Sequence, residues 1–125
     1  MKEIKIIGHA QFREVIMAVA RGERPAPPWA GGVTFESIDA VLYLLTPQNR
    51  QLLATIRDRK PQSISELAAM TGRAQSNLTR TLSKLESVGF VKMKNVARRK
   101  VPTTTIRSLR ISIDPYSQND RVEWA

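Results

Sequence analysis

The sequence contains no cysteine and a single histidine, His9. Without thiols the chain has no disulfides, thiolate metal sites or cysteine nucleophiles. One histidine with no neighbouring cluster of ligands also argues against a metal site or histidine-based catalysis. Neither a P-loop nor a dinucleotide-binding glycine pattern is present. We therefore expect no catalytic residue, no metal and no cofactor, and we do not expect an enzyme.

Long apolar runs are also missing. No stretch approaches the roughly 18 apolar residues of a membrane span, and Glu3 and Glu14 interrupt the N-terminal apolar pattern, unlike a signal peptide. With 42% hydrophobic and 25% charged residues, the 125-residue chain can bury the core of one domain. These features predict a cytoplasmic protein with no membrane partner.

Acidic residues are scarce in one region. Between Arg73 and Arg110 the chain has ten Lys and Arg residues and one acid, Glu86, whereas the net charge of the whole chain is +9. The charges of the remaining residues therefore sum to zero. A basic excess that is confined to one region indicates a polyanionic partner. This region contains one aromatic residue, Phe90, so it lacks the stacking platform typical of RNA-binding sites. We therefore expect double-stranded DNA, in preference to RNA, as the polyanionic partner.

The N-terminal third shows helical and loop signals. Phe12, Val15, Ile16 and Val19 recur at helical spacing and predict a helix over residues 8–22. Three prolines and three glycines in residues 22–32 then predict a loop that contains Trp29. We expect a short strand at 33–35 and a short apolar helix at 37–45, capped by Ser37.

Three further helices follow, each with recognisable start signals. Thr46 and Pro47 predict the start of a helix over 47–59. The capping box from Ser63 to Glu66 predicts a short helix that ends before Gly72. An amphipathic helix at 75–88 comes next, with leucines at 78, 82 and 85 on one face. Ala74 occupies its capping position, where no side-chain acceptor is available.

Beyond Gly89 the apolar period changes from helical to alternating. Residues 90–94 and 109–113 both alternate, which predicts a two-stranded hairpin whose long tip contains Arg98, Arg99 and Lys100. We expect residues 115–125 to form a polar, loosely held tail.

This order of elements resembles a winged helix-turn-helix domain. The stretch SISELAAMTGRAQSNLTRTLSKLESVGFV, residues 63–91, is similar to the pattern of MarR-type regulators. The chain also resembles a group of small MarR-like prokaryotic regulators, some of which act as antitoxins. The segments that carry this resemblance are residues 33–45, Thr46-Pro47, Ser63 to Ala68, Gly72-Arg73 and Val101-Pro102. The resemblance implies a mainly α fold with a small β-hairpin wing. It places an N-terminal helical extension at 1–45, the DNA-binding domain at 46–114 and the polar tail at 115–125.

The resemblance also implies a function. We expect a sequence-specific, double-stranded DNA-binding transcriptional regulator, acting as a repressor, with the helix at 75–88 in the major groove and the wing on the DNA backbone or in the minor groove. Asn and Gln can pair with adenine and Arg with guanine, while short hydroxyls reach phosphates or bases. The candidate DNA-binding residues are Arg73, Gln75, Ser76, Asn77, Thr79, Arg80, Lys84, Lys94, Arg98, Arg99 and Lys100.

Two kinds of protein partner are compatible with this assignment. A homodimer is expected, with its interface on the helix at 8–22 or on the strand at 109–113. The alternative is an antitoxin that neutralises a neighbouring small toxin by direct contact and autoregulates its operon. The N-terminal extension with Trp29 is the feature that would serve the antitoxin role.

Overall fold

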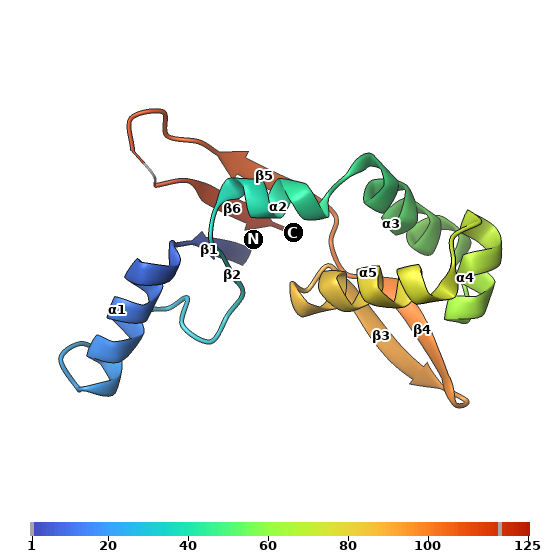
Figure 1. Cartoon of the computed structure of the whole chain (residues 1–125), viewed down its shortest axis with the longest axis horizontal. Helices are drawn as coiled ribbons and strands as arrows, with labels where there is room; N and C mark the ends of the chain where they lie inside the picture. The colour runs from blue at the N-terminus through green and yellow to red at the C-terminus, as the bar shows by residue number, and fades with distance from the viewer. Residues whose placement is uncertain (1, 118) are drawn as a thin grey trace. The chain divides into compact units, whose positions relative to one another are not determined.

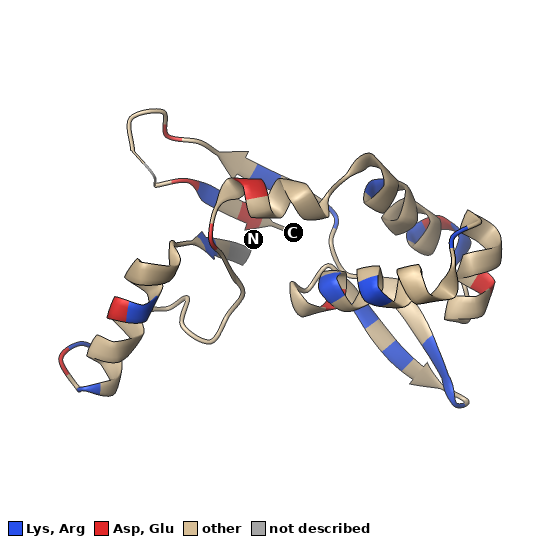
Figure 2. Cartoon of the chain, viewed as in Figure 1, with Lys and Arg blue, Asp and Glu red and all other residues tan. Residues whose placement is uncertain are grey.

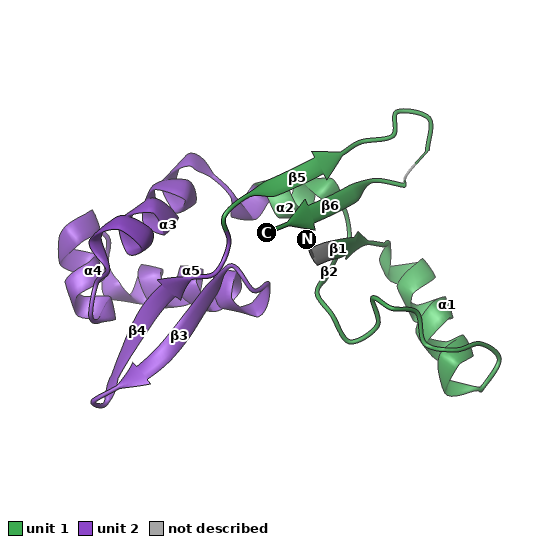
Figure 3. Ribbon diagram, turned by 180° about the vertical axis from the view of Figure 1, so that it is seen from behind, with its two compact units in different colours: residues 1–42, 107–125 green, residues 43–106 purple. Residues whose placement is uncertain are grey.

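A computed structural model describes residues 2–117 and 119–125 of the chain. These residues contain five α-helices and six β-strands, so the chain mixes helices and strands rather than being mainly α. They form two compact units (Figures 1 and 3). The central unit is residues 43–106, and the discontinuous unit is residues 1–42 together with residues 107–125.

The central unit contains three helices whose boundaries agree with the predicted ones to within one residue: α3 (Pro47–Arg59), α4 (Ile64–Thr71) and α5 (Gln75–Ser87). The Thr46 hydroxyl accepts a hydrogen bond from the Asn49 N–H at 3.2 Å, and the Ser63 hydroxyl accepts one from the Glu66 N–H at 3.0 Å. Gly72 ends α4 with a φ of +72°, a conformation that glycine adopts without strain. The capping residues therefore set the helix starts as expected.

Leucines from all three helices build the core of the central unit. Leu78, Leu82 and Leu85 of α5 are each at most 1% exposed, which confirms the predicted buried face. α4 contacts both α3 and α5. The other buried aliphatic and aromatic residues of this unit, prolines aside, are Leu52, Ile56, Leu67, Phe90, Val91 and Val101. Burying each of these side chains contributes about 1.5–3 kcal/mol before the entropy of ordering is subtracted.

A hairpin of β3 (Val91–Val96) and β4 (Arg99–Thr104) completes the central unit. Its two turn residues, Ala97 and Arg98, both have positive φ, as a tight type I′ turn requires. The predicted pairing of residues 90–94 with 109–113 across a long tip is therefore wrong. Pro102 hid β4 from the sequence pattern, yet the two-stranded sheet tolerates it opposite Met93 because an edge strand can lack a donor.

The discontinuous unit contains a four-stranded sheet in the order β2-β1-β6-β5. Its strands are β1 (Lys2–Ile6), β2 (Thr34–Phe35), β5 (Leu109–Ser112) and β6 (Arg121–Trp124). β1 is parallel to β2 and antiparallel to β6, which also pairs antiparallel with β5. The sheet thus joins the two ends of the chain.

Two sequence expectations about the chain ends are wrong. Residues 1–45 form more than a helical extension, because they also supply β1 and β2. Residues 115–125 are not a loosely held tail, because β6 lies in the middle of the sheet and Val122 is fully buried. The four residues of β6 are too few to show a recognisable strand pattern by themselves. Val122 of β6 pairs with Ile4, which lies at the other end of the chain.

The helices of the discontinuous unit bury different amounts of surface. α2 (Ile38–Leu44), which crosses the boundary between the units, buries Ile38 and Val41, whereas none of the twelve residues of α1 (His9–Ala20) is buried. The ring of Phe12 on α1 lies 6.0 Å from that of Trp29. None of the described helices has the length and apolar character needed to cross a membrane.

Candidate nucleic-acid interface

The side of α5 opposite its leucine core is exposed and polar. Ser76, Arg80, Ser83 and Ser87 recur at intervals of four, three and four residues, which places them on one helix face. All four are exposed. Ser83 was not among the predicted contact residues, although its spacing from Ser76 and Arg80 could have identified it. This face bears a positive charge and hydroxyl groups, and it carries no carboxylate.

The other α5 candidates flank this face. Gln75, Asn77, Thr79 and Lys84 are all exposed. The Thr79 hydroxyl donates a hydrogen bond to the Gln75 carbonyl oxygen at 2.9 Å, so it has a partner within the helix. No side chain caps the start of α5 at Ala74, and the first N–H groups of the helix therefore have no side-chain acceptor there.

Arg73 differs from the other candidates because its side chain is half-buried. Its Nε and Nη2 atoms donate to the Asn77 Oδ1 atom at 3.0 and 2.7 Å, and Nη2 also donates to the Thr81 hydroxyl at 3.1 Å. Its Nη1 atom is buried without a hydrogen-bond partner among the described residues. Reading a base with Arg73 would therefore require breaking these three hydrogen bonds.

The hairpin carries the remaining basic candidates. Lys94 on β3, Arg98 in the turn, and Arg99 and Lys100 on β4 are all exposed. Lys92 on β3 is exposed too, although it was not predicted as a contact. Ala97 and Arg98 have φ angles of +49° and +68°, each of which costs roughly 1–2 kcal/mol in a residue other than glycine. The type I′ turn that joins β3 to β4 requires these angles, so the turn itself accounts for them.

Glu86 is the one acid between Arg73 and Arg110, and it has a structural partner. Its Oε2 atom accepts a hydrogen bond from the Met93 N–H at 3.0 Å. Glu86 thereby links the last turn of α5 to β3. The single carboxylate of the basic region is thus explained by the junction between helix and hairpin.

The net charge of the chain is confined to the central unit. Residues 43–106 contain twelve Lys and Arg against three Asp and Glu, a net charge of +9, whereas the discontinuous unit contains eight of each (Figure 2). One of the three acids, Asp58, lies 2.7 Å from the Arg57 Nε atom, and this hydrogen bond lowers the pKa of its carboxyl group. The field around the central unit is therefore positive.

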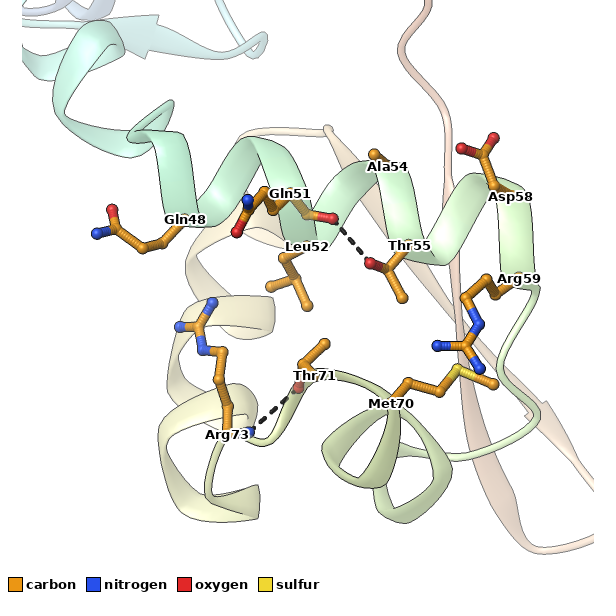
Figure 4. A pocket seen from close by; sticks show the side chains of 10 residues that line it. All are labelled: Gln48, Gln51, Leu52, Ala54, Thr55, Asp58, Arg59, Met70, Thr71 and Arg73. Carbon is orange, nitrogen blue, oxygen red and sulfur yellow. Dashed lines mark hydrogen bonds between the residues drawn. The ribbon is translucent and has the colours of Figure 1, made fainter.

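An open pocket of about 600 Å³ lies beside Arg73, between α3 and the segment from α4 to the start of α5 (Figure 4). It is lined by Gln48, Gln51, Leu52, Ala54, Thr55, Asp58, Arg59, Met70, Thr71 and Arg73. The acidic side chain in its lining, Asp58, accepts hydrogen bonds from the Arg57 guanidinium group. No cluster of three potential metal ligands occurs in the described part of the chain.

Fold and charge together define a two-unit chain in which one compact unit of three helices and a hairpin carries the entire net charge. The family HVO_A0114 matches residues 44–111, which are 68 of the 125 residues, and the chain belongs to this family. The match covers nearly all of the central unit and extends through most of β5. No curated protein and no solved structure matches the chain.

Proposed function

We propose that the central unit is a winged helix-turn-helix that binds double-stranded DNA sequence-specifically. In this proposal the chain is a MarR-like transcriptional regulator that represses by occupying its operator. α5 enters the major groove, and the hairpin acts as a wing on the DNA backbone or in the minor groove. The observation that carries the proposal is the exposed face of α5, which has Arg80 and hydroxyls opposite a buried leucine core and carries no carboxylate.

The charges support separate roles for the two elements. Arg80 projects from the face that would meet base edges, where arginine recognises guanine through two acceptors. Arg98, Arg99 and Lys100 lie on a narrow hairpin, where contacts to phosphates would supply affinity with little sequence information. In this proposal α5 therefore selects the sequence and the hairpin contributes salt-dependent binding.

The test is fluorescence-anisotropy binding to the duplex directly upstream of the chain's own gene and to a scrambled duplex, at several salt concentrations. Arg80→Ala should weaken binding to the upstream duplex about 5- to 100-fold, with a much smaller loss on scrambled DNA. Arg13→Ala, which removes an exposed arginine of α1, is the matched control and should change neither affinity. Equal, weak binding of wild type to both duplexes that disappears with rising salt would contradict sequence-specific recognition.

A protein partner is supported by a second observation, the unburied apolar side of α1. Phe12, Val15, Ile16 and Val19 form a stripe whose four side chains are each only half-buried, and no residue of the helix is fully buried. An isolated helix of about 12 residues is marginal in water, so covering this stripe would stabilise it. We propose a second copy of the chain as the cover, because the discontinuous unit has no net charge and two copies can meet there without charge repulsion.

Light scattering after size-exclusion chromatography tests the homodimer. The wild-type chain should have twice the monomer mass, and Ile16→Glu should convert it to a monomer that stays folded. Arg13→Glu, an adjacent exposed change, should leave the dimer intact. A monomeric wild type would contradict the homodimer. Co-purification with a small protein from the neighbouring gene would then support the antitoxin alternative.

A further inference from the structure

The hydrogen bonds of Arg73 determine which atoms Asn77 presents to its surroundings. Arg73 follows the turn between α4 and α5, and in Figure 4 its side chain extends toward α3 beside Gln48 and Gln51. Two of its nitrogen atoms, Nε and Nη2, donate to the single oxygen Oδ1 of Asn77 at 3.0 and 2.7 Å. The guanidinium group is therefore bound along α5 instead of extending freely into solvent.

The chemistry of the two groups leaves one orientation for the Asn77 amide. A guanidinium group has only donors, so the amide atom facing Arg73 has to be the oxygen. Two donated hydrogen bonds fill both acceptor positions of that oxygen. The Nδ2 group, with its two N–H donors, is left available on an exposed residue. Asn77 thus presents donors and no acceptor.

A donor-only asparagine cannot recognise adenine in the usual way. Adenine pairing requires the side-chain oxygen to accept from the adenine N6 amino group while the amide nitrogen donates to N7. Guanine presents two acceptors, N7 and O6, on its major-groove edge. We propose that Arg73 is a positioning residue that holds the Asn77 amide so that it reads guanine and rejects adenine. This inference rests on the proposed DNA-binding function of α5.

Two further contacts favour Arg73 as a fixed support. Its Nη2 atom also donates to the Thr81 hydroxyl at 3.1 Å, which holds the guanidinium one helical turn beyond Asn77. Its Nη1 atom is buried, so the group is held by packing as well as by hydrogen bonds. The positive charge beside Oδ1 also polarises the amide and strengthens the Nδ2–H donors. Arg73 therefore acts through Asn77 and makes no base contact of its own.

The experiment selects duplexes from a library with a randomised core, using the full-length chain. Wild type should enrich guanine at one position, and Asn77→Ala should lose the preference at that position alone. Arg73→Met keeps the length of the side chain but removes its donors, which frees Oδ1. It should shift the same position toward adenine, changing the guanine-to-adenine ratio about threefold to tenfold. The salt dependence of binding should stay as in wild type, because Arg73 contacts no phosphate.

Matched variants separate positioning from other roles. Arg59→Met removes an arginine that lines the same pocket and should leave the selected sequence unchanged. Thr81→Val retains the branched shape of the side chain but removes one acceptor of Arg73, so it should shift the same position in the same direction by a smaller factor. In the Arg73→Met background, adding Asn77→Ala should abolish the new adenine preference.

A measurement without DNA tests the contact itself, by nuclear magnetic resonance of the free chain. The Arg73 Nε–H should exchange slowly with solvent in wild type and rapidly in Asn77→Ala. Rapid exchange in wild type would overturn the proposed support.

The remaining outcomes distinguish the inference from the function on which it rests. A wild type that enriches no sequence overturns the proposed DNA recognition. A wild type that enriches a sequence while Arg73→Met selects the same one overturns only the positioning role. A salt slope lower by about one in Arg73→Met would make Arg73 a phosphate contact instead. A uniform loss of affinity with a lowered melting temperature would make it merely structural.

Discussion

The two units differ in charge and in how the chain builds them. The central unit is one continuous segment with a net charge of +9, whereas the discontinuous unit combines both chain ends and has no net charge. The central unit depends on capped helices and a tight hairpin, and most of its contacts join elements that follow one another in the sequence, although α3 and α4 also contact β4. The sheet of the other unit pairs Ile4 with Val122. Local contacts close short loops, so the central unit should order first during folding.

The units also differ in how completely they bury their own apolar surface. Each of α3, α4 and α5 contributes buried residues to the central core. In the discontinuous unit, α1 contributes none. The charged unit therefore buries the apolar faces of its helices within itself, whereas the neutral unit leaves the apolar side of α1 only half-buried. In the functions proposed above, polyanion binding and protein assembly would therefore use different parts of the chain.

The largest effect should come from placing a charge in the core of the neutral unit. Val122→Asp buries an unpaired carboxylate in the middle strand of the sheet, and it should destabilise that unit by at least about 4 kcal/mol. Amide hydrogen exchange on the full chain should show lost protection in β1, β5 and β6, with α3 to α5 still protected. Ser112→Asp, at an exposed position of β5, is the control. Loss of protection throughout would mean that the units unfold together.

The converse change lies in the charged unit. Leu82 is 1% exposed, and Leu82→Ala should cost about 2–5 kcal/mol through lost burial and the cavity left behind. The protection of amide hydrogens against exchange should fall in α3, α4 and α5, while the amides in the sheet of the discontinuous unit should stay protected. Chemical denaturation followed by hydrogen exchange measures both. If Leu82→Ala also reduced the protection of β6, the two cores would not be independent of each other.

Removing the positive charges of the hairpin tests whether DNA affinity depends on where the charges lie or only on how many there are. Changing Arg98, Arg99 and Lys100 to alanine should lower the salt slope of DNA binding by up to about three and the affinity roughly tenfold or more. The matched control changes three exposed arginines of the neutral unit to alanine: Arg13, Arg21 and Arg24. Both variants lose the same formal charge. Equal losses of affinity would show that only the total charge counts.

A smaller effect concerns helix caps within the charged unit. Thr46 caps α3, whereas Ala74 leaves α5 uncapped. Ala74→Ser should therefore raise stability by up to about 1 kcal/mol, and Thr46→Ala should lower it by a similar amount. Urea denaturation of both variants gives the two values. A neutral result for Ala74→Ser would show that the N–H groups at the start of α5 already have acceptors.

The smallest effect concerns the pKa values of two carboxyl groups, Asp58 in the central unit and Asp114 in the discontinuous unit. A hydrogen bond from Arg57 lowers the pKa of Asp58, and hydrogen bonds from Ser117 and Tyr116 lower the pKa of Asp114. Both should titrate below the ordinary value of 3.8, and the stability that each contributes is present above that value and lost as the pH falls through its lowered pKa. High salt should reduce the shift of Asp58 more, because its donor is charged. Carbon-detected titration measures both groups.

Sequence reasoning predicted the central helices well because their signals are local. Thr46, Ser63 and Gly72 mark helix ends through the hydrogen bonds and backbone angles that they provide, and those bonds are present. The leucine spacing of α5 likewise predicts its buried face. Ser83 was missed as a candidate although the same periodicity contained it.

Strand pairing was predicted poorly because a pairing partner is not a local property. The alternation at residues 109–113 was correctly recognised as extended, but its partner is β6 and not β3. The hairpin partner of β3 is β4, which Pro102 disguised. The link between Arg73 and Asn77 was also missed, because both residues suggest base readers when each is considered alone.

Three features follow from the amino-acid sequence alone: where the helices of the charged unit begin and end, which side of α5 is buried, and where the net charge is concentrated. These features depend on caps, on helical periodicity and on composition, which act within a few residues. Three others become visible only in the folded chain: the two chain ends share a sheet, α1 buries none of its residues fully, and Arg73 donates to the oxygen of Asn77. Each of these features depends on which groups pack against a given side chain. Local backbone propensities do not specify those packing partners.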